Sequence, residues 1–225
     1  MTVAGTQLQA QQMSETRYLV IGGHARGVGK TALVVDVIRA FPDVAWTAVK
    51  ITPHGHGAWP EDAATAQAGS TAVLQEEEDH GGSTDSSRYL VAGAQRAFWL
   101  RVREERLAEG MALLKPVLKG AECVILESNA AVEIVQPALY LLVVDPAQPE
   151  FKESARSVGR RADAIVTRQS IPDRLWGEAA DTVLRSKPLF EQRIGERLPG
   201  ALLALIRLRL FPYMHPGTPS RHLPD

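Results

Sequence analysis

The chain is 225 residues long, with 45% hydrophobic and 23% charged residues, and its formal net charge at pH 7 is −1. This apolar fraction excludes global disorder and is enough for one large core, while the charge balance argues against bulk nucleic acid or an anionic membrane as the main partner. The one cysteine, Cys123, excludes an internal disulfide and cysteine-rich metal sites. The apolar runs are too short for a signal sequence or a membrane span, so we expect a cytoplasmic protein.

The first fifty residues alternate between strand and helix patterns. We expect 1–16 to be a flexible tail, because this segment is polar and Gln-rich. The apolar run Tyr18–Gly22 predicts a buried strand, Thr31–Ala40 a helix and Trp46–Ile51 a second strand. A strand, a glycine-rich loop, a helix and a strand form a βαβ unit, which predicts a parallel sheet with a right-handed crossover.

The rest of the chain continues this alternation after one interruption. Residues 52–87 are rich in glycine, histidine and acidic side chains, and we expect a long loop or insertion there, with a minor helix at Glu61–Ala68. The further helices are expected at Ser86–Ala94, Glu104–Leu118, 152–161 and Gly195–Leu210, and the further strands at Ala97–Val102, Cys123–Glu127, Leu139–Val144, Ala162–Thr167 and Lys187–Phe190. The pattern predicts one α/β domain over 17–210, followed by an irregular tail over 211–225.

The most specific motif is the glycine-rich segment between the first strand and the first helix. It ends in Gly29-Lys30-Thr31, the end of the Walker A pattern G-x-x-x-x-G-K-[ST], although the first position of that pattern is His24. Backbone N–H groups and the helix N-terminus would bind phosphate, Lys30 would reach the β- and γ-phosphates, and Thr31 would bind Mg²⁺. We therefore expect a three-layer P-loop NTPase fold with a mostly parallel sheet. GTP or ATP would be bound with Mg²⁺ by Gly27, Val28, Gly29, Lys30, Thr31 and Ala32. The alternative is a glycine-rich turn with an accidental lysine.

Acidic and basic side chains at other element ends are candidates for the same site. Glu127 ends an apolar strand, where a Walker B carboxylate would bind Mg²⁺ or polarise the attacking water, so we assign it a catalytic role with Lys30. Asp145 is a second strand-end acid, but the proline after it favours a plain turn. Asp85 is either a Mg²⁺ partner or a helix N-cap, and Arg88 is either a phosphate contact or a surface residue.

Three histidines have no assigned role. His54 and His56 follow the second strand, at the edge of the sheet where ligands of doubly wound folds bind. Together with His24 they could bind a metal, position phosphate or transfer protons, whereas the alternative is a solvated glycine-rich loop.

The segment after the strand Ala162–Thr167 bears on the choice of base. GTPases read guanine with an [NT]-K-x-D sequence, and here Thr167 and Arg168 fit loosely while Ser170 replaces the aspartate. The sequence alone therefore leaves GTP and ATP open.

In ordered pieces from Tyr18 to Glu127, the chain resembles the P-loop family of molybdopterin-guanine dinucleotide biosynthesis protein B. The matching pieces are the GKT loop, Lys50 with His54 and His56, Asp85-Ser86-Ser87-Arg88, Ala92-Gly93-Ala94, and the apolar strand that ends in Glu127. Ser128-Asn129 stands where that family has Gly-Phe. The resemblance implies a GTP-binding protein that assists nucleotide attachment to the molybdenum cofactor, works with a partner enzyme and forms a homodimer.

The favoured function is a slow GTPase or ATPase that serves as an accessory factor in the assembly of the molybdenum cofactor or a related metallocofactor. One alternative is a small-molecule kinase that uses residues 52–87 as acceptor site or lid. Another is a nucleotide-regulated interaction module without turnover. None of the three readings includes nucleic acid or a membrane as a partner.

Overall fold

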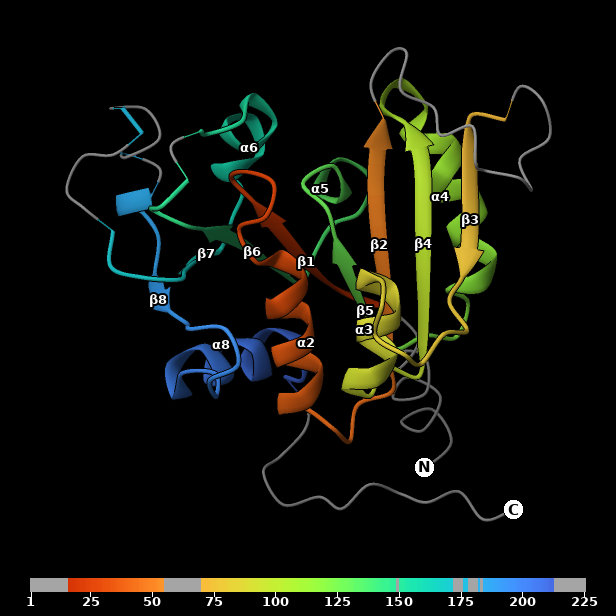
Figure 1. Cartoon of the computed structure of the whole chain (residues 1–225), viewed down its shortest axis with the longest axis horizontal. Coiled ribbons are helices and arrows are strands. Elements are labelled where there is room, and N and C mark those ends of the chain that lie inside the picture. The colour runs from red at the N-terminus through yellow and green to blue at the C-terminus, as the bar shows by residue number, and fades with distance from the viewer. Residues whose placement is uncertain are drawn as a thin grey trace, which may run out of the picture.

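The computed structural model describes residues 16–54, 70–148, 150–171, 176–177, 182 and 184–212. Within this part of the chain, a single sheet has the strand order β3-β4-β2-β5-β1-β6-β7-β8. All neighbouring strands are parallel except β3 and β4, which pair antiparallel at one edge. Helices cover both faces of the sheet, as expected for a three-layer α/β fold (Figure 1).

Most element bounds follow the sequence pattern, but the last helix begins at Gly200 rather than at Gly195, and the short helix Ala131–Ile134 was not expected. The strands are β1 Arg17–Gly23, β2 Trp46–His54, β3 Ala72–Glu76, β4 Arg96–Arg103, β5 Cys123–Glu127, β6 Leu139–Val144, β7 Ala164–Thr167 and β8 Leu189–Glu191. The helices are α2 Lys30–Ala40, α3 Asp85–Ala92, α4 Leu107–Val117, α5 Ala131–Ile134, α6 Glu153–Gly159 and α8 Gly200–Leu210, and a short 3₁₀ turn, η1 Glu104–Arg106, precedes α4. No described helix combines the length and the apolar character that crossing a membrane requires.

The central strands are continuous apolar runs because both of their faces are covered. Successive residues point to opposite sides, so that Ile21 joins the core formed with α2, α3 and α8, while Val20 joins the core formed with α4 and α6. Every residue of β6 is buried. This double burial is what the apolar strand patterns in the sequence predicted.

The segment expected to be a long loop over 52–87 departs from that prediction. β2 continues through His54, which pairs with Arg103 of β4, and residues Ala72–Glu76 add an edge strand on the far side of β4. This edge strand is only half-buried and ends in Gln75 and Glu76, so it lacks the apolar run that marks the inner strands. The helix expected at Glu61–Ala68 lies outside the described residues.

The topology sets the position of the site. β1 lies between β5 and β6, and the chain leaves β1 through the loop that leads into α2. The connection after β1 runs to β2 on one side, and the connection after β5 runs to β6 on the other side. The carboxyl ends of these strands therefore border the place where the strand order reverses, which is where ligands bind in open α/β sheets.

Candidate functional site

The loop between β1 and α2 has the backbone of an anion-binding turn. Gly27 and Gly29 adopt left-handed conformations, with φ of +76° and +92°. Gly29 is also the N-cap of α2, and no side chain caps this helix end. The N–H groups of the first turn are thus left for another acceptor, and the helix N-terminus favours a negative one. Val28 and Ala32 are buried, so they would contribute through their backbone rather than their side chains.

Asn129, just after β5, holds the start of this loop. Its Oδ1 accepts from the N–H of Gly23 at 2.8 Å, and its Nδ2 donates to the Gly23 carbonyl at 2.9 Å. A Cβ atom on Gly22 would lie 2.5 Å from the same Oδ1. In the sequence, Ser128-Asn129 stands out only as a departure from the pattern of the family that the chain resembles. The signal for this contact is an amide side chain two residues after the strand that ends in Glu127.

A buried hydrogen-bond network joins the helix to the strand-end acid. The Thr31 hydroxyl donates to Glu127 Oε2 at 2.8 Å, and the Tyr89 hydroxyl donates to the same oxygen. Burial raises the pKa of Tyr89 well above its usual value, and the Glu127 charge adds to this shift, so Tyr89 stays protonated as a donor. Two of the three residues predicted to bind Mg²⁺, Thr31 and Glu127, are thus brought together. Tyr89, on α3, was not foreseen.

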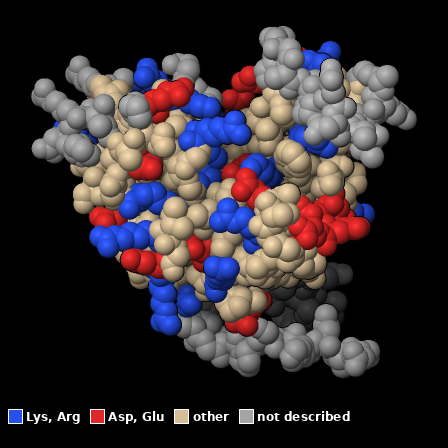
Figure 2. Space-filling view, in the orientation of Figure 1, with Lys and Arg blue, Asp and Glu red and all other residues tan. Residues whose placement is uncertain are grey.

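Lys30 lies within a group of cationic side chains. Its Nζ donates to the Ala25 carbonyl at 3.2 Å. Burial lowers the pKa of Lys30, the charges of Lys50, Lys152 and Arg26 lower it further, and Glu127 opposes them. Figure 2 shows Lys and Arg side chains gathered in the upper middle of the face that carries α2, with a few acids among them. The electrostatics therefore favour an anion beside Lys30.

Arg168 secures the other end of the loop. Its guanidinium donates to the Gly29 carbonyl through Nη2 and to the Gln192 carbonyl through Nη1 at 3.1 Å. Burial lowers the pKa of Arg168, and Asp36 and Asp145 oppose this shift. The residue considered for base recognition is therefore a backbone clamp for the N-cap of α2.

His24 has a structural place rather than a ligand-binding one. Its Nδ1 accepts from the Asp145 N–H at 3.4 Å, so its Nε2 donates to the Gln148 carbonyl at 3.3 Å. The ring is fully buried, with centroid distances of 5.2 Å to Phe151 and 4.8 Å to Trp176. Burial lowers the pKa of His24, which keeps the imidazole neutral. The Walker A position that departs from glycine thus anchors the segment after β6.

The structure does not bring His54 or His56 together with His24. His54 ends β2 and pairs in register with Arg103, on the opposite side of β1 from the segment that holds His24. His56 lies outside the described residues. Among the residues that the structure describes, no group of three or more His, Cys, Asp or Glu side chains could hold a metal ion.

Asp85 and Arg88 lie together on α3. Asp85 forms an ion pair with Lys50 and is 3.7 Å from Arg88 Nη1. The N-cap of α3 is Thr84, whose side chain accepts from the Ser87 N–H, so the expectation that Asp85 could be the N-cap is wrong. The proposed contacts of Asp85 with Mg²⁺ and of Arg88 with phosphate stay predictions. Asp145 accepts from the Ala147 N–H in a turn, as its proline neighbour indicated.

Comparison with solved structures agrees with the architecture. HypB from Helicobacter pylori, solved in complex with nickel, is similar over 96% of this chain and 96% of that one, with a TM-score of 0.51 and 12% identity. LpxK from Aquifex aeolicus, solved with ATP, gives a TM-score of 0.45 at 15% identity over 89% of this chain and 65% of that one. No protein-family model and no curated protein matches the sequence. The fold is that of a P-loop NTPase, as the sequence predicted.

Proposed function

We propose that this chain binds a nucleoside triphosphate, GTP or ATP, in the loop between β1 and α2. The observation that carries the proposal is the hydrogen bond between the Thr31 hydroxyl and the Glu127 carboxylate, next to the Lys30 ammonium. A glycine loop alone could bind any anion. A hydroxyl and a carboxylate that meet beside a lysine at the helix N-terminus are what a nucleotide with its metal requires.

The residues present fit Mg²⁺. Mg²⁺ prefers hard oxygen ligands and is usually held by one or two protein groups together with substrate phosphates. Thr31 and Glu127 would hold it, and their oxygens already lie 2.8 Å apart. Bound Mg²⁺ would neutralise charge on the β- and γ-phosphate oxygens. Asp85 is the more distant candidate, because Lys50 engages its carboxylate.

The chain's own groups can support slow hydrolysis. Lys30 would stabilise negative charge that develops on the γ-phosphoryl oxygens. Glu127 has a second carboxylate oxygen, Oε1, that could accept a hydrogen bond from an attacking water, while Tyr89 and Thr31 hold Oε2. Because Asn129 and Arg168 hold the two ends of the loop, phosphate would meet a pre-organised backbone.

We further propose an accessory role in the assembly of the molybdenum cofactor or a related metallocofactor, with a partner enzyme and as a homodimer. This proposal is supported by the resemblance of the GKT loop, of Lys50 with its neighbours, and of Glu127 to molybdopterin-guanine dinucleotide biosynthesis protein B. A small-molecule kinase is the second candidate, favoured by Arg101 and Arg103, which follow Trp99, the register partner of Lys50, on β4. A module without turnover would bind nucleotide and release no phosphate.

Calorimetry with GTP and ATP, with and without Mg²⁺, tests the proposal. We expect Lys30→Ala to abolish nucleotide binding, while Lys119→Ala, an exposed lysine in the turn before β5, keeps the affinity within twofold. Unchanged affinity in Lys30→Ala would contradict the proposal.

A phosphate-release assay separates the catalytic role of Glu127 from a structural one. We expect Glu127→Gln to lower the rate of phosphate release more than the nucleotide affinity. Equal losses would mean that Glu127 only supports the loop.

A further inference from the structure

A set of polar side chains shares one face of two neighbouring strands next to the loop 24–29, which is proposed to bind phosphate and is called the phosphate loop below. The strand register pairs Lys50 with Trp99, Thr52 with Arg101, and His54 with Arg103. We call these six residues the cationic sheet face. The residues between them, among them Ile51, Leu100 and Val102, point the other way into the core under α4.

This surface continues directly from the nucleotide site. A single rung of the sheet runs from Ile21 of β1 through Glu127, Lys50 and Trp99 to Gln75 of the edge strand. Residues in register on neighbouring strands point to the same side of a sheet. Lys50 is therefore the member of the cationic sheet face that lies next to Glu127, the carboxylate proposed to bind Mg²⁺.

The chemistry of the strands changes halfway along this face. Closer to the start of the strands, Trp46, Ala48 and Ala97 lie in the core that α2 and α3 cover. Figure 1 shows α3 in front of the lower part of β2 and beside the lower part of β4, whereas no labelled helix lies in front of the upper parts of these strands. Inner strands of such sheets are normally apolar on both faces. Two strands that turn polar together therefore indicate a function for that surface.

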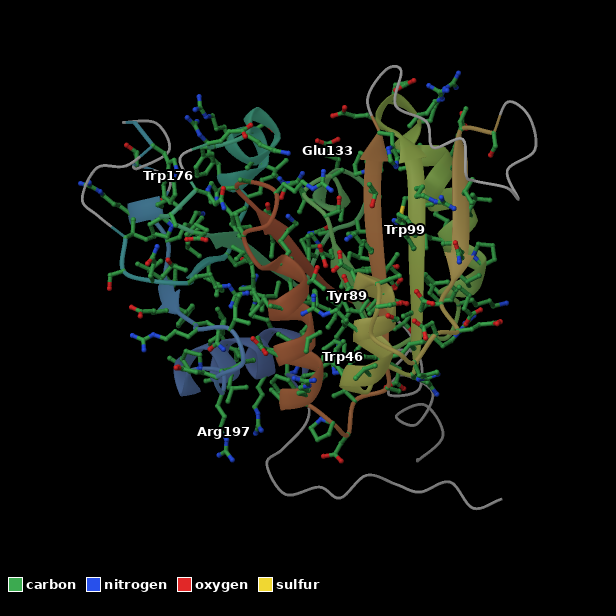
Figure 3. All side chains as sticks on the ribbon, in the orientation of Figure 1. Trp46, Tyr89, Trp99, Glu133, Trp176 and Arg197 are labelled. Carbon is green, nitrogen blue, oxygen red and sulfur yellow. The ribbon has the colours of Figure 1, made fainter. Side chains whose placement is uncertain are left out.

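Arg101 is the residue that points to a ligand. Only 6% of it is exposed, its Nε is buried without a hydrogen-bond partner, and it forms no ion pair with any described residue. Its Cζ lies 4.6 Å from the centroid of the Trp99 ring, and Trp99 is held by a 2.9 Å hydrogen bond to Thr52. Figure 3 shows Trp99 of β4 above Tyr89 of α3. A buried guanidinium without a counter-charge is costly, and an anion would compensate it.

We propose that the cationic sheet face binds a small molecule that carries a carboxylate or phosphate group, with its oxygens on Arg101 and its body beside Trp99. The planar guanidinium fork matches such oxyanions bidentately. None of the six residues is acidic, which disfavours a metal ion, and the burial of Arg101 favours a small ligand over a macromolecular surface. The inference goes beyond the proposed function, because this binding requires no nucleotide.

Titration of the full-length ¹⁵N-labelled protein with phenyl phosphate and benzoate tests the site. The reporter is the indole Nε1–H signal of Trp99, identified with Trp99→Phe, and benzyl alcohol is the uncharged control ligand. We expect a saturable shift with at least one of the two anions and none with benzyl alcohol. A response to only one of them tells whether the site takes phosphate or carboxylate.

Variants then locate the binding. We expect Arg101→Met to weaken the affinity at least tenfold and Arg101→Lys to weaken it less, because lysine keeps the charge without the fork. The matched control is Arg96→Met, which removes an arginine of the same strand that pairs with Glu76 at the other end. We expect this control to stay within twofold of the wild type.

Two outcomes would overturn the inference. The first is a Trp99 response that is absent, or that Arg101→Met and Arg101→Lys both leave unchanged. The second is a response that disappears in Lys30→Ala, since the anion would then occupy the phosphate loop. A Trp99 response retained in a chain that binds neither GTP nor ATP would support this site and refute the proposed function.

Discussion

The phosphate loop and the cationic sheet face are both positively charged, but their charges are held differently. Around the loop, Lys30 donates to a backbone carbonyl and lies near Glu127, and Arg168, which follows β7, donates to two carbonyls. On the sheet face, Arg101 is more deeply buried and its guanidinium donates to no described carbonyl or carboxylate, whereas in Arg168 only the Nε lacks a partner. Protein groups pre-organise the first region, whereas the second leaves a buried charge for a ligand to complete. Stability measurements can separate the two cases.

The largest effect is expected at the end of β1, just before the loop, where the backbone is packed tightly against Asn129 and Tyr140. Gly22→Ala would place a Cβ 2.5 Å from Asn129 Oδ1 and 2.7 Å from the Tyr140 hydroxyl. We expect a loss of about 3 kcal/mol in the free energy of unfolding, because neither neighbour can move without breaking the packing. Chemical denaturation measures this loss.

Gly27→Ala, in the loop that follows, is the matched control. A Cβ there would meet nothing within 4 Å, so only the left-handed backbone opposes it, and we expect a loss of about 1 kcal/mol. Equal losses in the two variants would mean that the start of the loop is not held by close packing.

Two buried tyrosines allow the next test. Tyr89 donates to the Glu127 carboxylate, whereas the Tyr140 hydroxyl is buried without a hydrogen-bond partner. We expect Tyr89→Phe to cost about 2 kcal/mol of unfolding free energy, as for other hydrogen bonds to charged groups. We expect Tyr140→Phe to be neutral or stabilising, since it removes a polar atom that burial leaves unsatisfied. A greater loss for Tyr140→Phe would contradict the network around Glu127.

Removing the Arg101 side chain should stabilise the protein, whereas the substitutions at Gly22, Gly27 and Tyr89 should destabilise it. We expect Arg101→Met to raise the free energy of unfolding by about 1 kcal/mol, because it removes an uncompensated buried charge and keeps similar volume. Thermal and chemical denaturation both measure this. Arg96→Met should change the free energy of unfolding little, because the ion pair between Arg96 and Glu76 is exposed to solvent. A destabilised Arg101→Met would show that the guanidinium is already compensated in the free protein.

The smallest effect is a pH dependence at His24. Burial holds the folded pKa of His24 below the usual 6.5, so the unfolded chain takes up the proton first as the pH falls. The stability due to the neutral ring is therefore present above about pH 6.5 and is lost as the pH falls below it. We expect His24→Gln to flatten the fall in stability between about pH 7 and pH 5.5. His80→Gln, at an exposed position, should leave that slope unchanged.

The fold was predictable because its signals are local. The inner strands are unbroken apolar runs, and the Gly29-Lys30-Thr31 sequence marks the loop where a strand passes into a helix. The edge strand β3 was missed because half-buried edge residues need no apolar run. Asn129 and Tyr89 were missed because their roles depend on partners 106 and 38 residues away in the sequence.

The sequence by itself determined the α/β class, the position of the glycine-rich loop between β1 and α2, and Glu127 as the strand-end acid. Only the tertiary structure decided that His24 is a buried anchor and that Arg168 is a backbone clamp. It also decided that Arg101 lies beside Trp99 on a surface continuous with Glu127. The physical reason is the distance along the chain over which each kind of signal acts. Propensity and burial patterns act between near neighbours in the chain, whereas a side chain's partners and its desolvation depend on the strands and helices that the sheet order places next to it.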